Sequence, residues 1–243
     1  MGNRVHTGKN AMRICIFADI HGNIDALEKM LDCETGETDL FIFAGDIWGY
    51  FYGQKEIIDI FMSMPNLVAI KGNHEKFYLS GKKMEKLTDK YGSSYKIHLT
   101  NNQQRYIEKL PNKVELIIKG KHIGVFHGGP YDYLEQRLYP DSLAYIDQII
   151  KEFNYDYLIL GHTHYQVFYK TKGTIVINPG SLGQPRDGKG FSYCLLNTET
   201  GSCTYKNVDI EISKLLKLVE EKDADKYVLK YLKNKYSKQE VNS

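Results

Sequence analysis

The stretch MRICIFADIHGN, residues Met12–Asn23, decides how the fold is interpreted. Its first seven residues are mostly apolar, include β-branched side chains and end abruptly in Asp19-Ile20-His21-Gly22. A short apolar run of this kind favours a strand buried on both faces over a helix. We therefore expect a buried strand with polar side chains at its carboxyl end.

Four later runs repeat this pattern, and each stops near a glycine beside a polar residue: Asp39–Ala44, Asn66–Ile70, His122–Phe126 and Tyr155–Leu160. Segments with apolar residues at helical spacing lie between the runs: Ile24–Leu31, Lys55–Met64 and Ser142–Phe153. Strands that alternate with helices predict α/β units.

After Gly161 the strand candidates follow one another closely and are joined by glycine-containing turns: Tyr165–Tyr169, Thr174–Ile177, Phe191–Asn197 and Ser202–Asp209. This spacing predicts an antiparallel meander after the α/β half.

The two ends of the chain differ from its body. Residues 1–11 contain no apolar run, so we expect a flexible leader or a cloning remnant there and no signal peptide. Residues 12–243 show no repeat or linker, which predicts a single domain. Within it, residues 214–243 form a predicted helical tail with eight Lys and five acidic residues, either packed on the body or serving as an interaction helix.

Composition excludes several classes. The 243 residues are 42% hydrophobic and 26% charged, unlike collagen-like, disordered or coiled-coil chains. No apolar run reaches the roughly 20 residues that span a bilayer, so no membrane association is expected. The net charge of +2 is no sign of a nucleic-acid binder, although the Lys-rich tail could form a basic groove locally. A homo-oligomer is left open.

The cysteines bear on the compartment and on the kind of metal site. Cys15, Cys33, Cys194 and Cys203 are widely spaced, and no CxxC pair is present. A thiolate metal site is therefore not expected, and a reducing cytoplasm is the default location.

Metal-competent residues gather where the strand candidates end: Asp19, His21, Asp46, Asn73, His74, His127, His162 and His164. Any one of them alone is more often a structural residue than a ligand. The carboxyl ends of strands in α/β sheets meet at one edge, however, so residues far apart in sequence can converge there. Five of the eight histidines belong to this set, and that joint pattern favours a metal site.

Oxygen and imidazole ligands without thiolates suit Mn²⁺, Fe, Zn²⁺, Co²⁺ or Ni²⁺ rather than Ca²⁺ or an iron–sulfur cluster. Even seven of these eight candidate ligands are too many for one tetrahedral ion. They are enough for two ions if one carboxylate bridges them, and such a pair can activate a shared water.

These motifs resemble those of the calcineurin-like metallophosphoesterases. The blocks occur in the family's order: Asp19-Ile20-His21-Gly22-Asn23, Gly45-Asp46, Gly72-Asn73-His74-Glu75, His127-Gly128 and Gly161-His162-Thr163-His164. The stretch from Asn178 to Arg186 is similar to a small bacterial and archaeal branch described as diadenosine-tetraphosphatase-like or protein-phosphatase-like. The resemblance implies an α/β fold, a four-layer α/β/β/α sandwich of two mixed sheets flanked by helices.

The resemblance also implies roles. Asp19, His21 and His164 would hold one ion, Asn73, His127 and His162 a second, and Asp46 would bridge them. Two divalent transition-metal ions are expected, Mn²⁺ first, with Fe, Zn, Co or Ni as alternatives. His74 would face the substrate and assist the leaving group. The implied activity is hydrolysis of a phosphomonoester, phosphodiester or nucleotide pyrophosphate bond, in a phosphorylated small molecule or nucleotide, by hydroxide held between the ions.

Several alternatives remain at this stage. Glu75 either orients His74 or caps a helix. Asn73, His74, Ser181 and Arg186 are candidate substrate contacts, although the stretch around Ser181 could simply form a turn. The aromatic residues from Trp48 to Tyr52, like Tyr131 and Tyr133, could stack a nucleobase or pack under a loop. The alternative function is a non-catalytic metal-binding interaction scaffold of the same fold.

Overall fold

The computed structural model describes residues 3–5, 12–81, 96–171, 173–221 and 228–234. They form two mixed β-sheets. The first has the strand order β11 (Cys203–Val208), β10 (Phe191–Asn197), β2 (Arg13–Phe17), β3 (Leu40–Phe43), β4 (Leu67–Ala69). The second has the order β1 (Asn3–Val5), β5 (Lys113–Ile118), β6 (Lys121–Phe126), β7 (Tyr157–Ile159), β9 (Ile175–Pro179), β8 (Gln166–Lys170).

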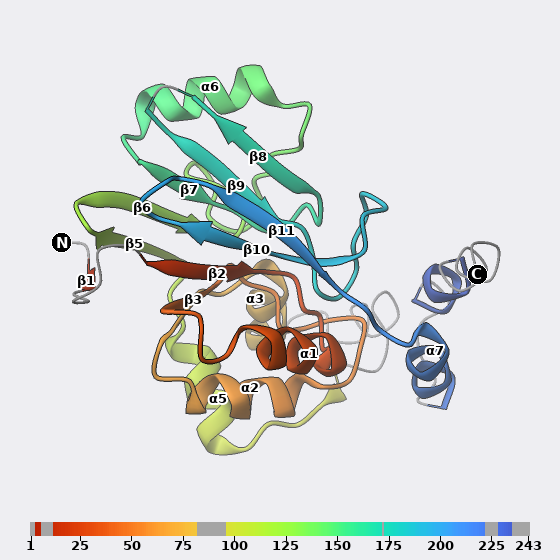
Figure 1. Cartoon of the computed structure of the whole chain (residues 1–243). Coiled ribbons are helices and arrows are strands. Elements are labelled where there is room, and N and C mark those ends of the chain that lie inside the picture. Colours follow the sequence, from red (N-terminus) through yellow and green to blue (C-terminus); the bar gives the residue numbers. More distant parts are fainter. Residues whose placement is uncertain (1–2, 6–11, 82–95, 172, 222–227, 235–243) are drawn as a thin grey trace.

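Helices cover the outer face of each sheet, as Figure 1 shows. On the β2 side lie α1 (Ile24–Glu34), α2 (Gln54–Ser63) and α5 (Asn101–Lys109), and α3 (Asn73–Ser80) follows β4. The β7 side is covered by α6 (Leu143–Glu152). This arrangement confirms the expected four-layer α/β/β/α sandwich.

Alternation along β2 explains why its sequence is apolar throughout. Ile14 and Ile16 face the core between the two sheets, whereas Cys15 and Phe17 belong to the core beneath α1 and α2. Successive side chains of a strand point to opposite faces, and here both faces are buried. A third apolar cluster, which includes Ile146 and Ile149, joins α6 to the second sheet.

The predicted meander after Gly161 is wrong. β8 and β9 form an antiparallel pair in the second sheet, and β9 lies parallel to β7. β10 and β11 form another antiparallel pair, but β10 joins the first sheet through β2. Turn spacing predicts hairpins and does not reveal which sheet each one joins. The segment between Pro179 and Phe191 therefore crosses from one sheet to the other.

The leader predicted to be flexible needs a correction as well. Asn3–Val5 forms β1, which pairs in parallel with Leu116–Ile118 of β5. Pairing at a sheet edge uses backbone hydrogen bonds, which need no apolar run in the sequence. The remaining leader residues, 1–2 and 6–11, lie outside the described residues.

The C-terminal tail packs on the body over its described part. Helix α7 (Ile212–Glu221) buries Ile212, Leu215 and Val219 against the core under the first sheet, and Val228 and Leu232 join the same cluster. Tyr231 donates a hydrogen bond to the carbonyl of Pro185 at 3.1 Å. Residues 222–227 and 235–243 of the predicted tail lie outside the described residues. No described helix is long and apolar enough to cross a bilayer.

Two cysteines meet across the β10–β11 pair. In the strand register Cys194 faces Tyr205 and Cys203 faces Leu196, so the two cysteines are diagonal neighbours, and they form a disulfide. Cys15 is free and buried, and Cys33 is free and exposed. Wide spacing along the sequence concealed this pairing.

Replacement of a core ring should test the layer beneath the first sheet. Phe17 is fully buried, and its ring lies 5.3 Å from that of Phe43 and 6.0 Å from that of Phe61. We expect Phe17→Ala to lower the free energy of unfolding by about 3–5 kcal/mol in urea titrations, because a cavity adds to the lost transfer energy. Phe168→Ala, at an exposed site, is the matched control, with a change within about 0.5 kcal/mol. Equal losses would contradict this assignment of the core.

Candidate metal centre

The eight metal-competent residues predicted from the sequence converge where strands of both sheets end. Asp19 and His21 follow β2, Asp46 follows β3, and Asn73 and His74 open α3 just after β4. The other three come from the second sheet, since His127 follows β6 and His162 and His164 follow β7. All eight are buried.

Their side chains form three overlapping groups that could hold a metal ion. Ligand atoms lie within 4.8 Å of one another in the groups Asp19-His21-His164, His21-Asp46-His74 and Asp46-His127-His162. Asn73 Oδ1 lies 3.0 Å from His127 Nε2, which places the amide beside the last group. The two ligand sets implied by the family resemblance are thus each brought together, with Asp46 between them.

Backbone carbonyls orient three of the histidines. The Nδ1 atoms of His21, His127 and His164 lie 2.5 to 2.8 Å from the carbonyl oxygens of Trp48, Ala44 and Gln184. A proton on Nδ1 that is donated to a carbonyl leaves Nε2 as the free ligand atom. The donor set therefore suits divalent transition-metal ions. The carbonyl partners could not be predicted from the sequence, because every residue has a carbonyl.

The backbone at the centre is held in an uncommon conformation. Asp19, His21, Asp46, His162 and His164 have φ between 50° and 69°. This left-handed region is disfavoured for residues with a Cβ atom, and such strain concentrates at functional sites. Gly72 allows a close approach, because a Cβ there would lie 2.0 Å from Asp46 Oδ1.

Electrostatics divide the cluster into charged and neutral groups. Burial lowers the pKa of His127, but the carboxylates of Asp46 and Asp19 outweigh it and raise that pKa to about 10. Burial lowers the pKa of His21 and His164, and burial with the charge of His127 lowers that of His162 to about 3. Neutral imidazoles can bind a metal cation directly. A cation bound here would also take the place of the proton on His127 as the positive partner of the Asp46 carboxylate.

Glu75 does more than either alternative proposed from the sequence. Its fully buried carboxylate caps α3 by accepting the N–H of Gly72 at 2.6 Å. It also accepts the N–H groups of Asp46 at 3.0 Å and of Trp48 at 2.9 Å. Because the Trp48 carbonyl in turn accepts from His21, Glu75 holds both the loop that carries Asp46 and the carbonyl that orients His21.

The predicted substrate contacts differ from one another. Ser181 is fully buried, its hydroxyl donates to the Asp19 carbonyl at 2.7 Å, and it accepts the N–H groups of Gly183 and Gln184. These bonds favour the turn-forming alternative over phosphate contact. Arg186 is exposed at the rim, where its Nη2 donates to Gln184 Oε1 at 3.1 Å and to the Tyr50 hydroxyl at 3.4 Å.

The aromatic residues from Trp48 to Tyr52 mostly pack. Trp48 is fully buried and stacks on Tyr78 with ring centroids 3.8 Å apart, and Phe51 is 1% exposed. Tyr50 lies edge-on to His21 at 4.7 Å and is the aromatic residue of this stretch that adjoins the centre. Tyr131 and Tyr133 are exposed, and their rings contact Tyr145 and Phe126 respectively.

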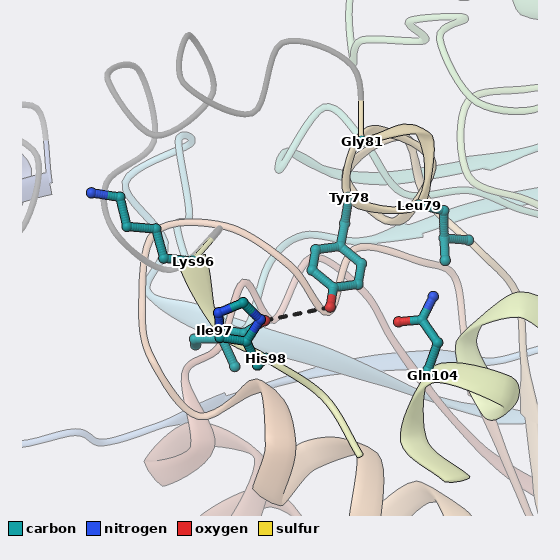
Figure 2. Close-up of a pocket in the computed structure, with 7 residues that line it drawn as sticks. All are labelled: Tyr78, Leu79, Gly81, Lys96, Ile97, His98 and Gln104. Atoms are coloured by element: carbon teal, nitrogen blue, oxygen red, sulfur yellow. Dashed lines mark hydrogen bonds between the residues drawn. The ribbon is translucent and has the colours of Figure 1, made fainter. Parts of the chain in front are cut away.

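A pocket of about 440 Å³ lies beside the far end of α3 (Figure 2). The Tyr78 hydroxyl donates to the Ile97 carbonyl at 3.4 Å within it. Its other lining residues are Leu79, Gly81, Lys96, His98 and Gln104, and no candidate ligand is among its lining residues. Helix α3 thus begins at the metal centre and ends beside a separate hollow.

The model of the calcineurin-like phosphoesterase superfamily domain matches residues 12–201, which contain every candidate ligand. The chain belongs to this superfamily. Members of the calcineurin-like phosphoesterase superfamily are associated with metal-dependent hydrolysis of phosphoesters, and the clustered His and Asp groups agree with metal binding.

Individual relatives show the same likeness. Protein MJ0912 of Methanocaldococcus jannaschii is 29% identical over 224 residues, covering 83% of this chain and 89% of the relative. The crystal structure of a metallophosphoesterase from Sphaerobacter thermophilus has a TM-score of 0.77 at 25% identity, covering 92% of this chain and 98% of that one. Protein PH1004 of Pyrococcus horikoshii OT3 has a TM-score of 0.79 at 20% identity, covering 90% and 97%, and supports the fold alone.

One residue at the centre escaped sequence interpretation. Arg137, in the loop after β6, donates from Nε to His162 Nε2 at 3.2 Å. It lies in no recognised motif. The available signal was that arginine is rare here, with five among the 32 basic residues.

The three-amide contact of Glu75 predicts a structural effect on the centre. Glu75→Gln keeps the size but turns an NH₂ group toward backbone N–H donors. We expect the free energy of unfolding to fall by about 2–4 kcal/mol in urea titrations, since hydrogen bonds to buried charged groups are worth about 1.5–3 kcal/mol each. Bound metal, measured by elemental analysis, should fall too.

The matched control is Glu37→Gln, whose exposed carboxylate pairs with Arg13. Its stability should change by less than about 1 kcal/mol and its metal content should stay at the wild-type level. A Glu75→Gln protein with wild-type stability and metal content would refute the anchoring role.

Proposed function

We propose that the protein is a two-metal phosphoesterase that hydrolyses a phosphomonoester, phosphodiester or nucleotide pyrophosphate bond in a phosphorylated small molecule or nucleotide. The observation that carries the proposal is the pair of buried ligand groups, Asp19-His21-His164 and Asp46-His127-His162, beside His74. The superfamily of the chain supports the reaction type.

The proposed ions fit the residues present. Asp19, His21 and His164 would hold one ion, Asn73, His127 and His162 the other, with Asp46 shared. Two divalent cations, Mn²⁺ in our proposal, would activate water and stabilise negative charge on the phosphoryl oxygens. The protein's own contribution is to fix these side chains through carbonyl partners and strained backbone before any substrate arrives.

His74 is the proposed proton donor. Its backbone N–H donates to Asp46 Oδ1 at 2.9 Å, and its Nε2 lies 4.0 Å from Asp46 Oδ2. The ring packs between those of His21, at 4.8 Å, and Phe77, at 5.9 Å. A histidine fixed in this way can hydrogen-bond a phosphoryl oxygen or protonate the departing oxygen.

The basic experiment compares Mn²⁺-loaded protein with chelator-treated protein on p-nitrophenyl phosphate and bis-p-nitrophenyl phosphate. We expect hydrolysis of at least one of them that is lost on chelation and restored by Mn²⁺. Protein that retains two ions and cleaves neither compound would contradict the proposal and favour the interaction scaffold. Elemental analysis of the protein as purified tests the choice of Mn²⁺ over Fe, Zn, Co and Ni. The cytoplasmic location stays a prediction.

Removal of the Asp46 carboxylate charge should test whether this residue is shared by the two proposed ions. Asp46→Asn is expected to lower kcat at least 1000-fold and to reduce the bound metal below two ions per chain, because both ligand groups lose a charged donor. Asp39→Asn is the matched control at the opposite end of β3, and it should retain both ions. Full metal occupancy in Asp46→Asn would exclude the shared position.

Substitution of His74 should separate proton transfer from metal binding. His74→Asn is expected to lower kcat by about 10²- to 10⁴-fold while both ions remain bound. The exposed His98 offers a control, since His98→Asn should retain wild-type kcat. If His74→Asn lost the metals along with activity, His74 would be a ligand instead of a proton donor.

A further inference from the structure

Two arginine side chains border the metal centre, one at each ligand group. Arg137 donates from Nε to His162 Nε2 at 3.2 Å, beside the Asp46-His127-His162 group. The backbone N–H of Arg186 donates to the His164 carbonyl at 3.2 Å, and its guanidinium reaches Tyr50, whose ring packs on His21. Arg186 therefore borders the Asp19-His21-His164 group.

These two arginines differ from Arg13 and Arg105. Arg13 pairs with the carboxylates of Glu34 and Glu37, and Arg105 donates to the carbonyl of Asn101 on its own helix. Arg137 and Arg186 are exposed and have no carboxylate partner within the described ranges. A guanidinium beside a metal centre and without a carboxylate partner can bind an oxyanion through its fork of N–H donors.

The loop that carries Arg137 is built to hold it in place. The N–H groups of Gly128 and Gly129 donate to the carbonyls of Tyr133 and Asp132, so the chain folds back on itself after His127. The Asp132 carboxylate accepts the N–H groups of Leu134 and Glu135, and is thus engaged within the loop. Leu134 and Leu138, on either side of Arg137 in the sequence, are buried and anchor this part of the chain.

Arg186 is fixed just as firmly at the sheet-to-sheet crossing. Its Nη2 donates to Gln184 Oε1 at 3.1 Å, and the Gln184 carbonyl is the partner of His164 Nδ1. The carbonyl of the preceding residue, Pro185, accepts the hydroxyl of Tyr231 from the tail. Both arginines therefore lie on anchored chain segments, and among the residues that the structure describes neither guanidinium forms an ion pair.

We propose that Arg137 and Arg186 together bind the second of two consecutive phosphoryl groups while the first lies at the metal centre, so that the preferred substrate is a phosphoanhydride such as a nucleoside diphosphate. Two divalent cations would already neutralise the negative charge of the phosphoryl group that they bind. Two further cationic groups, one at each end of the centre, match a second phosphoryl group of the same molecule. This inference rests on the proposed two-metal function for its catalytic part.

The reaction balances as a hydrolysis. The oxygen of water bonds to one phosphorus, the bridging P–O bond breaks, and the second phosphoryl group leaves as an anion. At neutral pH one proton is released for each water consumed. Phosphate leaves as a more stable anion than an alkoxide, so this substrate needs less help from His74 than an alkyl phosphate does.

Binding of two matched nucleotides tests the arginines without catalysis. AMP and α,β-methylene-ADP differ by one phosphoryl group, and the methylene bridge blocks hydrolysis. We expect Mn²⁺-loaded wild-type protein to bind α,β-methylene-ADP at least 10-fold more tightly than AMP in calorimetric titrations. Arg137→Gln and Arg186→Gln should each remove most of that preference and change AMP affinity by less than about 3-fold.

Arg105→Gln is the matched control on α5 and should keep the full preference. Elemental analysis should show two ions in every variant. Equal wild-type affinities for the two nucleotides, equal losses for both nucleotides in the arginine variants, or retention of the preference in either variant would overturn the proposal.

Steady-state kinetics adds a second readout. We expect kcat/KM for ADP to fall at least 10-fold in each arginine variant, mainly through KM, while Arg105→Gln keeps the wild-type value for ADP. A wild-type protein that prefers α,β-methylene-ADP through both arginines but hydrolyses nothing would refute the phosphoesterase proposal and uphold the anion site. Hydrolysis of p-nitrophenyl phosphate without nucleotide preference would do the reverse.

Discussion

The buried carboxylate of Glu75 holds together three backbone segments on which the metal centre depends. Its two oxygens accept N–H groups from the loop after β3, at Asp46 and Trp48, and from Gly72 at the start of α3. A buried carboxylate is costly unless its oxygens are hydrogen-bonded, and here every bond comes from the backbone. The charge that stabilises the helix start thereby fixes the position of Asp46.

Hydrogen bonds between the two sheets also position candidate ligands. The Asp19 carboxylate, after β2, accepts the N–H of His162, after β7, at 3.0 Å. His127, after β6, meets the carbonyl of Ala44 at 2.8 Å, and Ser181 bonds to the carbonyl of Asp19. Polar bonds thus join the layers at the end where the apolar core between the sheets stops. They satisfy groups that would otherwise be buried without partners and orient the ligand atoms at the same time.

Much of the fold could be predicted from Met12–Ala18 and the runs like it, because strands buried on both faces have continuous apolar sequences. β5 was missed because Lys113 and Glu115 interrupt its apolar residues, and α3 because its first residues are the metal-competent Asn73 and His74. The sheet membership of β9 and β10 depends on pairing with strands distant in sequence, which local patterns do not encode.

The residues that form the candidate centre could be predicted from the sequence, but the groups that orient them could not. Histidine and aspartate beside glycine at strand ends are visible in the sequence, whereas the carbonyls of Ala44, Trp48 and Gln184 are chemically the same as any others. Arg137 was not predictable either, because its contact with His162 arises from a loop that folds back on itself. The sequence therefore indicated which side chains could bind a cation, and the structure showed which groups orient those side chains.

The division of the candidate ligands between two sheets has a mechanical consequence. Four of the seven follow strands of the first sheet and three follow strands of the second. Ions bound between them would act as a cross-link between the layers, at the end where the segment from Pro179 to Phe191 passes from one sheet to the other. The free energy of ion binding would then add to the free energy of unfolding of the two-sheet sandwich. The concentration of available metal would therefore determine the lifetime of the folded protein as well as its activity.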